Sequence, residues 1–274
     1  MNNRNQSEGE YLSSYDFSKY EKPSVTTDIV AFMIRSEENE NYKMDSKNRL
    51  SILLVKRAVH PFLGSWALPG GFLRPDETME RCAFREITEE AGVTPTALMP
   101  IGVFSEPKRD PRGWIISNAY ASIISEESVK QVGGDDASDA QWFDIDFAKE
   151  EDGSSILTLS YEDIRLQAVL REEGTKFGRT SFRIEQSGGI AFDHAGIIAT
   201  ALTALREVAR NYETLFDFLP ERFTLSALQR VQETILNIQI LPANFRRKVS
   251  EYVVETDEYT QGAGHRPAKL YRKK

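Results

Sequence analysis

Cysteine and long apolar runs are nearly absent from this sequence. Cys82 is the only cysteine among 274 residues, so the chain cannot form an internal disulfide. The longest apolar runs, such as Ser51 to Val55, are far shorter than the roughly 20 residues that a membrane-spanning helix needs. The polar stretch from Met1 to Glu10 also lacks the apolar segment of a signal peptide. We therefore expect a cytoplasmic protein without a membrane partner.

Positive charge is scarce over most of the chain and gathers at one end. The formal net charge is −8, which argues against a nucleic-acid-binding surface that covers the whole protein. Residues 218–274 contain 10 Lys and Arg against 6 Asp and Glu, which leaves 24 of the 34 basic and 36 of the 42 acidic residues for 1–217. An acidic body with a basic end suggests two tasks, although chance clustering explains the same asymmetry.

Composition and local pattern predict an ordered protein of one large or two ordinary domains. The hydrophobic fraction of 40% exceeds that of disordered chains. A mixture of strands and one helix with clear start and stop signals predicts a mixed sheet in an α+β or α/β/α fold. The expected elements are strands at 25–34, 50–55, 114–124 and 140–145, short strands with loops over 155–185, and a helix over 190–216.

One helix is delimited clearly by the residues at its two ends. Thr78 can cap its start, and Gly92 can close it in a left-handed conformation. Phe84, Ile87 and Ala91 fall within one narrow arc, so we expect them to face the core.

Acidic residues on this helix follow a glycine at a fixed distance. Gly71 is followed by Glu77 and then by the run Arg85 to Val93, which reads REITEEAGV. Glu86 and Glu90 are four residues apart and share a helix face, with Glu89 beside them. Clustered carboxylates repel one another, and a hard divalent cation such as Mg²⁺ or Mn²⁺ would remove that repulsion. The alternative is a solvated acidic helix face.

Basic residues flank this acidic helix in the sequence. Arg57 follows the strand at 50–55, and Arg109 and Arg112 lie on the loop 106–113. Arginine's planar fork suits the oxygens of phosphate and ribose phosphate, so these residues are candidate substrate ligands. A solvated turn capped by Asp110 would explain the same loop. A further acid could come from Asp135, Asp136 or Asp139, although aspartates in a glycine-rich stretch are usually part of a turn.

The basic end of the chain has the pattern of a DNA-binding unit. A capped helix is predicted from Thr224 to Leu236, and Pro242 suits the first turn of the next helix. In that second helix Phe245 and Val249 would face inward and leave a basic outer face. A recognition helix presents side chains in this way, although a helical cap or dimerisation module would have the same spacing. The DNA-binding candidates are Asn244, Arg246, Arg247, Lys248 and Arg266.

The run from Gly71 to Val93 resembles the Nudix box at every fixed position. This family has an α/β/α sandwich around a mixed sheet and cleaves nucleoside diphosphates linked to another moiety, usually with Mg²⁺. The resemblance implies that Glu86, Glu89 and Glu90 are metal ligands. It implies that Glu77 and Arg85 orient the catalytic residues, and that Gly71 lies close to the substrate.

A narrower resemblance covers most of residues 23–274. The segments 66–72 and 109–112 are similar to ADP-ribose pyrophosphatases and to Nudix-related transcriptional regulators of NAD metabolism. The segments 192–195, 219–225, 244–248 and 265–271 resemble the C-terminal half of those regulators, which is a winged helix-turn-helix domain. The implied domains are a polar segment at 1–22, a Nudix domain with a β extension at 23–190, a connecting helix at 191–217, and a winged helix at 218–274.

These observations leave three functions open. The main reading is metal-dependent hydrolysis of ADP-ribose to AMP and ribose 5-phosphate. The alternative is a transcriptional regulator that binds ADP-ribose or a sugar-derived effector through the Nudix domain and DNA through the winged helix, as a homodimer. Many such regulators have a degraded Nudix box, whereas this sequence retains a complete one. A non-catalytic interaction module would require the box to be vestigial.

Overall fold

The computed structural model describes residues 7–36, 48–95, 97–124, 129, 140–176, 179–260 and 267–274. Arg266, a candidate for DNA binding, lies outside these residues, as do Asp135, Asp136 and Asp139. No helix in these ranges is long and apolar enough to cross a membrane.

Within the described residues, ten strands form one mixed sheet. The path through the sheet is β10-β9-β8-β7-β2-β1-β6-β5, with β3 paired to β2 and β4 paired to β1. β1 and β6 run parallel, and the other pairings are antiparallel. The strands are β1 (Ser24–Ser36), β2 (Asn48–Lys56), β3 (Trp66–Ala67), β4 (Gly70–Phe72), β5 (Leu98–Phe104), β6 (Ile115–Ile123), β7 (Ala140–Lys149), β8 (Ser154–Tyr161), β9 (Ile164–Lys176) and β10 (Arg179–Gln186). This sheet confirms the mixed topology expected from the sequence.

The region 155–185 differs from its prediction, because it forms long strands and not short strands with loops. β8, β9 and β10 contain 8, 13 and 8 residues and continue the same antiparallel sheet. Leu166, Ala168 and Leu170 of β9 are buried, whereas Arg165 before them and Gln167 between them are exposed. This alternation is the period-two pattern of a strand with one buried face, and charged residues on the other face hide it in the sequence.

The helix α2 (Met79–Ala91) covers one face of the sheet and has the predicted ends. The side chain of Thr78 accepts a hydrogen bond from the N–H of Arg81, and Gly92 has a φ of 63°. Its buried residues are Cys82, Ala83 and Ile87, and Ala91 packs partly buried against the same core cluster, so the predicted stripe was right for Ile87 and Ala91 and wrong for Phe84. The helix is rotated because it packs under the β4 turn, where Cys82 contacts the carbonyl oxygens of Gly71 and Phe72.

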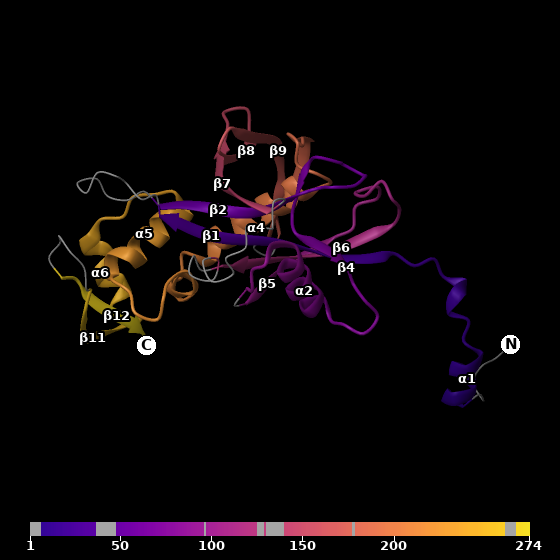
Figure 1. Cartoon of the computed structure of the whole chain (residues 1–274), viewed down its shortest axis with the longest axis horizontal. Coiled ribbons are helices and arrows are strands. Elements are labelled where there is room, and N and C mark those ends of the chain that lie inside the picture. The colour runs from indigo at the N-terminus through magenta and orange to yellow at the C-terminus, as the bar shows by residue number, and fades with distance from the viewer. Residues whose placement is uncertain are drawn as a thin grey trace.

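The helix α4 (His194–Val208) lies on the opposite face, inside the curve of the sheet. All residues from 194 to 202 are buried, and α4 contacts strands from both ends of the sheet. Those ends approach each other, since the guanidinium of Arg179 in β10 lies 4.9 Å from the ring centre of Phe104 in β5. α2 and α4 on opposite faces complete an α/β/α sandwich (Figure 1).

The predicted helix over 190–216 is thus shorter than expected. It starts after a turn in which Gly188 and Gly189 have positive φ, and a 3-10 helix, η3 (Tyr212–Phe218), follows it. The expected connecting helix is therefore part of the core. The domain limits given above stay predictions.

The C-terminal region forms a second, smaller unit at one end of the molecule (Figure 1). It contains the helices α5 (Leu225–Leu236) and α6 (Pro242–Val249), followed by the antiparallel strands β11 (Val253–Tyr259) and β12 (Lys269–Lys273). Thr224 caps α5 and Pro242 begins α6, as predicted. A bridge between Phe223 and Tyr271 joins the start of this unit to its last strand. This arrangement is a winged helix.

The N-terminal segment lies at the other end of the molecule (Figure 1). It contains the short helix α1 (Glu8–Ser14) and the 3-10 helix η2 (Phe17–Lys19). The rings of Tyr11 and Tyr15 lie 5.6 Å apart, which is the local packing that their spacing allows.

Candidate functional site

The turn between β3 and β4 brings backbone directly against the acidic face of α2. A side chain at position 71 would place its Cβ 2.3 Å from a carboxylate oxygen of Glu86, so any larger residue there would displace that carboxylate. The N–H of Gly70 donates a hydrogen bond of 3.0 Å to Oε2 of Glu90. The turn therefore positions two of the three predicted metal ligands.

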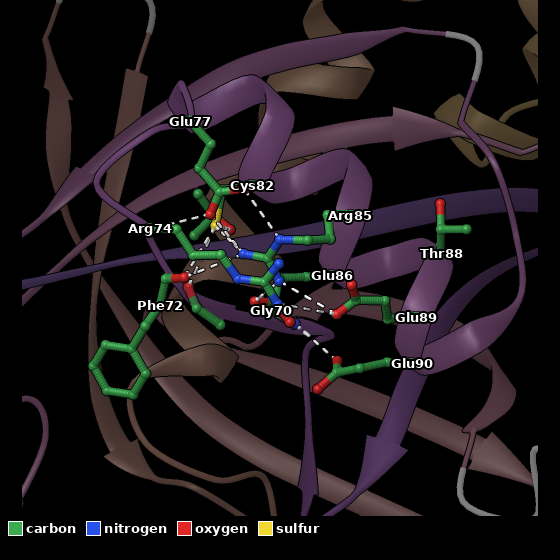
Figure 2. A network of polar contacts seen from close by, with 12 residues as sticks. Gly70, Phe72, Arg74, Glu77, Cys82, Arg85, Glu86, Thr88, Glu89 and Glu90 are labelled. Atoms are coloured by element: carbon green, nitrogen blue, oxygen red, sulfur yellow. Dashed lines mark hydrogen bonds and ion pairs between the residues drawn. The ribbon is translucent and has the colours of Figure 1, made fainter.

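Arg85 is the centre of the polar network on α2 (Figure 2). Its Nε and Nη2 donate to the two carboxylate oxygens of Glu77 at 3.0 and 2.6 Å. Its Nη1 donates to Glu86 at 2.6 Å and to Glu89 at 3.3 Å. The predicted contact of Arg85 with Glu89 is present, but its strongest partner is Glu77 through a two-pronged ion pair. Glu77 thus orients Arg85.

The electrostatic environment separates the two ends of this acidic cluster. Hydrogen bonds from Arg85, and a weaker one from the backbone of Arg74, lower the pKa of Glu77 to about 2. At the other end, desolvation raises the pKa of Glu90 to about 7, and the nearby carboxylates of Glu86 and Asp28 add to the effect. Glu90 thus lies near two other carboxylates, and no arginine among the described residues is hydrogen-bonded to it.

The predicted metal cluster of Glu86, Glu89 and Glu90 is not assembled. Among the residues that the structure describes, no three Asp, Glu, His or Cys side chains converge as a metal site. The reason is that Arg85 holds Glu86 and Glu89, while Glu90 is bonded to Gly70. The donor set nevertheless fits Mg²⁺ or Mn²⁺, since all three groups are hard oxygen ligands and the charge around Glu90 favours a cation.

A cleft of about 130 Å³ lies beside this cluster and contains all four predicted substrate-binding residues, Arg57, Gly71, Arg109 and Arg112. The guanidinium carbons of Arg57 and Arg112 lie 4.8 and 5.4 Å from the ring centre of Phe192. Arg112 is paired with Asp110 at 2.6 Å, whereas no described carboxylate lies within ion-pair distance of Arg57. Burial, and then the charge of Arg112, lowers the pKa of Arg57. An anion in the cleft would relieve this repulsion.

Arg109 has a different environment from the one expected. Its side chain is 4% exposed, and its guanidinium donates to both oxygens of Asp193 at 2.8 and 2.6 Å. It also contacts Asp28 at 3.3 Å. Because two carboxylates already neutralise its charge, Arg109 is better placed to hold the cleft together than to bind a phosphate directly.

The cleft includes residues that were missing from the sequence-based site. Asp28 accepts a hydrogen bond from Ser117 and faces His194, whose Nδ1 accepts from the N–H of Leu68 at 2.9 Å. Burial lowers the pKa of His194, which favours the neutral ring. Arg109 and Asp193 are 84 residues apart in the sequence, and Leu68 and His194 are 126 residues apart. No local signal reveals such pairs, although the segment 192–195 was noted for its family resemblance.

A second candidate surface lies on α6 of the C-terminal unit. Phe245 and Val249 are fully buried, as predicted, and the ring of Tyr212 packs 5.9 Å from that of Phe245. The predicted DNA-binding side chains on the same helix are all exposed, namely Asn244, Arg246, Arg247 and Lys248. No described carboxylate forms an ion pair with the three basic ones, so their charges are available to a polyanion.

Two domain families match successive parts of the chain. The NUDIX domain matches residues 41–159, and the NrtR DNA-binding winged helix domain matches residues 215–272. Together they span both candidate sites, and the winged-helix match confirms the fold expected for the C-terminal unit.

The curated relatives include a transcriptional repressor and a pyrophosphatase. The ADPR responsive transcriptional repressor NtrR of Acinetobacter baylyi is 29% identical over 97% of this chain and 88% of its own length. The ADP-ribose pyrophosphatase of Methanocaldococcus jannaschii is 46% identical, over 34% of this chain and 54% of its own length.

Solved structures match nearly the whole chain. The structure of Shewanella oneidensis NrtR in complex with a 27mer DNA is 27% identical, covers 91% of this chain and 93% of that one, and has a TM-score of 0.62. A MutT/nudix family protein from Enterococcus faecalis is 31% identical, covers 99% of this chain and 95% of that one, and has a TM-score of 0.72. The chain therefore belongs to the MutT/Nudix family, in a form that ends in an NrtR-type winged helix.

Proposed function

We propose that this protein is a transcriptional regulator that binds ADP-ribose in the Nudix cleft and DNA through the winged helix. The observation that carries the proposal is the presence, in one chain, of a cationic cleft beside the Nudix box and an exposed basic α6. Similarity to an ADPR responsive repressor along 97% of the chain supports the same combination. The proposal adopts the alternative expected from the sequence in preference to hydrolysis as the main role.

In the cleft, Arg57 and Arg112 would bind the diphosphate of the ligand. Both guanidinium groups border the same ring, and Arg57 has no described carboxylate partner that must first be displaced. The glycine at position 71 would let the diphosphate approach the backbone. Arg109 would act indirectly, since its bonds to Asp193 and Asp28 fix the loop that carries Arg112.

On the winged helix, α6 would enter the major groove. The exposed side chains of Asn244, Arg246, Arg247 and Lys248 would contact bases and phosphates, while Phe245 and Val249 anchor the helix. A homodimer with two such helices, matched to two DNA half-sites, is part of this proposal.

DNA selection followed by titration tests the regulatory role. We expect purified protein to enrich a specific duplex from a random-sequence pool, and its affinity for that duplex to change when ADP-ribose is added. The double variant Arg246→Ala/Arg247→Ala should lose the duplex, whereas Arg165→Ala/Arg183→Ala, which removes equal charge from the Nudix sheet, should retain it. Failure of the protein to select any duplex would overturn the regulatory proposal.

Hydrolysis of ADP-ribose to AMP and ribose 5-phosphate is the second candidate function. The complete Nudix box favours it, because the N–H of Gly70 holds the carboxylate of Glu90 at the end of the acidic cluster. Glu86, Glu89 and Glu90 would hold Mg²⁺ or Mn²⁺, which would polarise the diphosphate when bound. Glu77 would keep Arg85 oriented towards Glu86 and Glu89, and similarity to an ADP-ribose pyrophosphatase supports the choice of substrate.

A substrate panel distinguishes turnover from binding alone. The protein is incubated with Mg²⁺ and a set of dinucleotides and nucleotide sugars, and the release of AMP is followed by chromatography. We expect ADP-ribose to be cleaved fastest, with Glu90→Gln inactive and Glu207→Gln, on the exposed end of α4, fully active. Absence of turnover for every substrate would exclude hydrolysis while leaving the regulatory proposal intact.

A further inference from the structure

Phe192 has an unusual backbone conformation at the wall of the cleft. Its φ is 53°, in the left-handed region that residues with a side chain seldom adopt. It stands two residues before the first residue of α4 and lines the cleft. Strain of this kind persists only where surrounding contacts impose it, and it is concentrated at functional sites.

The ring of Phe192 holds the two arginines that we assign to the diphosphate. Arg57 and Arg112 both lie over it, and Phe62 packs edge-on against it at 4.8 Å. Each guanidinium is attracted to the ring, which offsets the repulsion between the two positive charges. An anion that binds both arginines would draw them away from the ring and change its packing.

The residues around Phe192 are bonded to both walls of the cleft. The N–H of Ala191 donates to the carbonyl of Trp66 at 2.8 Å, and His194 accepts from the N–H of Leu68. Asp193 accepts two hydrogen bonds from the buried guanidinium of Arg109. The start of α4 therefore cannot move without the loops that form the cleft.

The other end of α4 is bonded to the winged helix. The Nε of Arg206 donates to the carbonyl of Ile235 at 3.2 Å, and the amide of Gln232 donates to the carbonyl of Ala209 at 3.1 Å. Ile235 and Gln232 belong to α5, and Arg206 and Ala209 belong to α4 and its C-cap. α5 in turn fixes the turn before α6, because Glu233 accepts a hydrogen bond from the N–H of Ile240 at 2.7 Å. One helix of 15 residues thus connects the cleft to the support of α6.

We propose that Phe192 is a positioning residue that holds Arg57 and Arg112 for a diphosphate, and that α4 transmits the displacement of its ring to α5 and α6. The proposal rests on the regulatory function above, since it needs one protein that binds both ligands. In this proposal, the diphosphate ligand and DNA each favour one position of α4, and the helix thereby couples the two sites.

The first test measures the coupling between the two sites at the cleft end. The probes are α,β-methylene ADP-ribose, which cannot be cleaved, and the duplex selected by the wild-type protein. The coupling ratio is the Kd for DNA with the analogue divided by the Kd without it, and ratios of about 5 to 150 in either direction are usual for coupled sites. Phe192→Leu should weaken analogue binding and bring the ratio to about 1, whereas Phe192→Tyr, which keeps the ring, should restore it.

The second test acts at the opposite end of α4, far from the cleft. Arg206→Met removes the hydrogen bond to Ile235 but keeps an unbranched apolar stem in place of the arginine's. It should leave the affinity for the analogue within about twofold of wild type while reducing the coupling ratio at least about threefold. If Phe192→Leu and Arg206→Met have the same Tm as the wild type, general unfolding does not explain their effects. If Phe192→Leu does not fold, the Arg206→Met result decides by itself.

The outcomes separate this proposal from the function on which it rests. If the wild-type protein binds no selected duplex or shows a coupling ratio of 1, the regulatory function fails. If the wild type is coupled and both Phe192→Leu and Arg206→Met keep its ratio, the regulatory function stands and the role of Phe192 and α4 is overturned.

Discussion

The buried arginines of the Nudix region and the arginines of α6 differ in what surrounds them. Arg85 and Arg109 are largely buried, and each has at least two carboxylate partners. Arg246 and Arg247 are exposed and form no ion pair with a described residue. The charges of Arg85 and Arg109 are thus fixed before a ligand arrives, whereas the α6 charges become fixed only on contact.

This difference indicates how each region recognises its ligand. Buried, paired guanidiniums are weakly screened by salt and hold neighbouring loops in one geometry, which suits a small ligand of defined shape. Exposed, unpaired guanidiniums can adjust their position and are strongly screened by salt, which suits the regular phosphates of DNA. Mutations in the cleft should therefore alter stability or catalysis, and mutations on α6 should alter salt-dependent affinity.

The largest effect is expected for Glu90→Gln in the hydrolysis assay. We expect kcat to fall by at least about a thousandfold, since groups that act as one catalytic unit cost far more to remove than groups that orient them. Binding of the uncleavable analogue in the absence of metal should remain within about threefold. A variant that turns over ADP-ribose at a wild-type rate would show that Glu90 is not part of the reaction.

Removal of a partner from the buried arginine should destabilise the fold. Asp193→Ala leaves Arg109 with only the longer contact to Asp28, so we expect a loss of about 3 kcal/mol in the free energy of unfolding. The matched control is Glu207→Ala, which breaks an exposed pair with Arg210 and should cost less than about 1 kcal/mol. Denaturant titrations of both variants provide the measurement, and equal losses would contradict the comparison.

Removal of two charges from α6 should act on affinity and not on stability. Arg246→Ala/Arg247→Ala should make the negative slope of log K against log salt shallower by about 1.8, because each lost phosphate contact contributes about 0.9 to its magnitude. Fluorescence anisotropy over a salt series measures this slope. An unchanged slope would mean that these side chains do not contact phosphates.

The smallest effect concerns the pH dependence of stability at Glu77. Its pKa of about 2 in the folded protein lies below the ordinary 4.5, so the fold favours the ionised form. The stabilisation by Glu77 is complete above about pH 4.5 and disappears as the pH falls towards 2. Glu77→Gln should therefore lower the Tm at pH 7, with the difference from wild type shrinking on acidification. If the difference in Tm between the variant and the wild type does not depend on pH, the ion pair is not its cause.

Features set by neighbouring residues were predictable from the sequence. Thr78, Thr224 and Pro242 mark helix starts through local hydrogen bonding or fixed φ, and the structure places the helices there. The contact of Arg85 with Glu89 and the outward face of α6 were predictable for the same reason. Spacing along one helix determines which side chains share a face.

Features set by distant partners were not predictable. Neither the pairing of Arg109 with Asp193 nor the place of Phe192 over two arginines follows from any local pattern. Cys82 and Ala83 are buried in place of Phe84 because the β4 turn packs against α2. Such contacts depend on how the sheet curves, which no short segment encodes.

The enclosure of α4 by the sheet has a consequence for synthesis of the chain. Nine consecutive residues of this helix are buried, and the strands that enclose it, from β1 to β10, all precede it in the sequence. A ribosome that adds about 5 to 20 residues per second therefore synthesises every strand of the sheet before the helix that the sheet encloses. The winged helix emerges last. The chain can thus complete its cationic cleft, including the bonds at Asp193 and His194, before the basic surface of α6 exists.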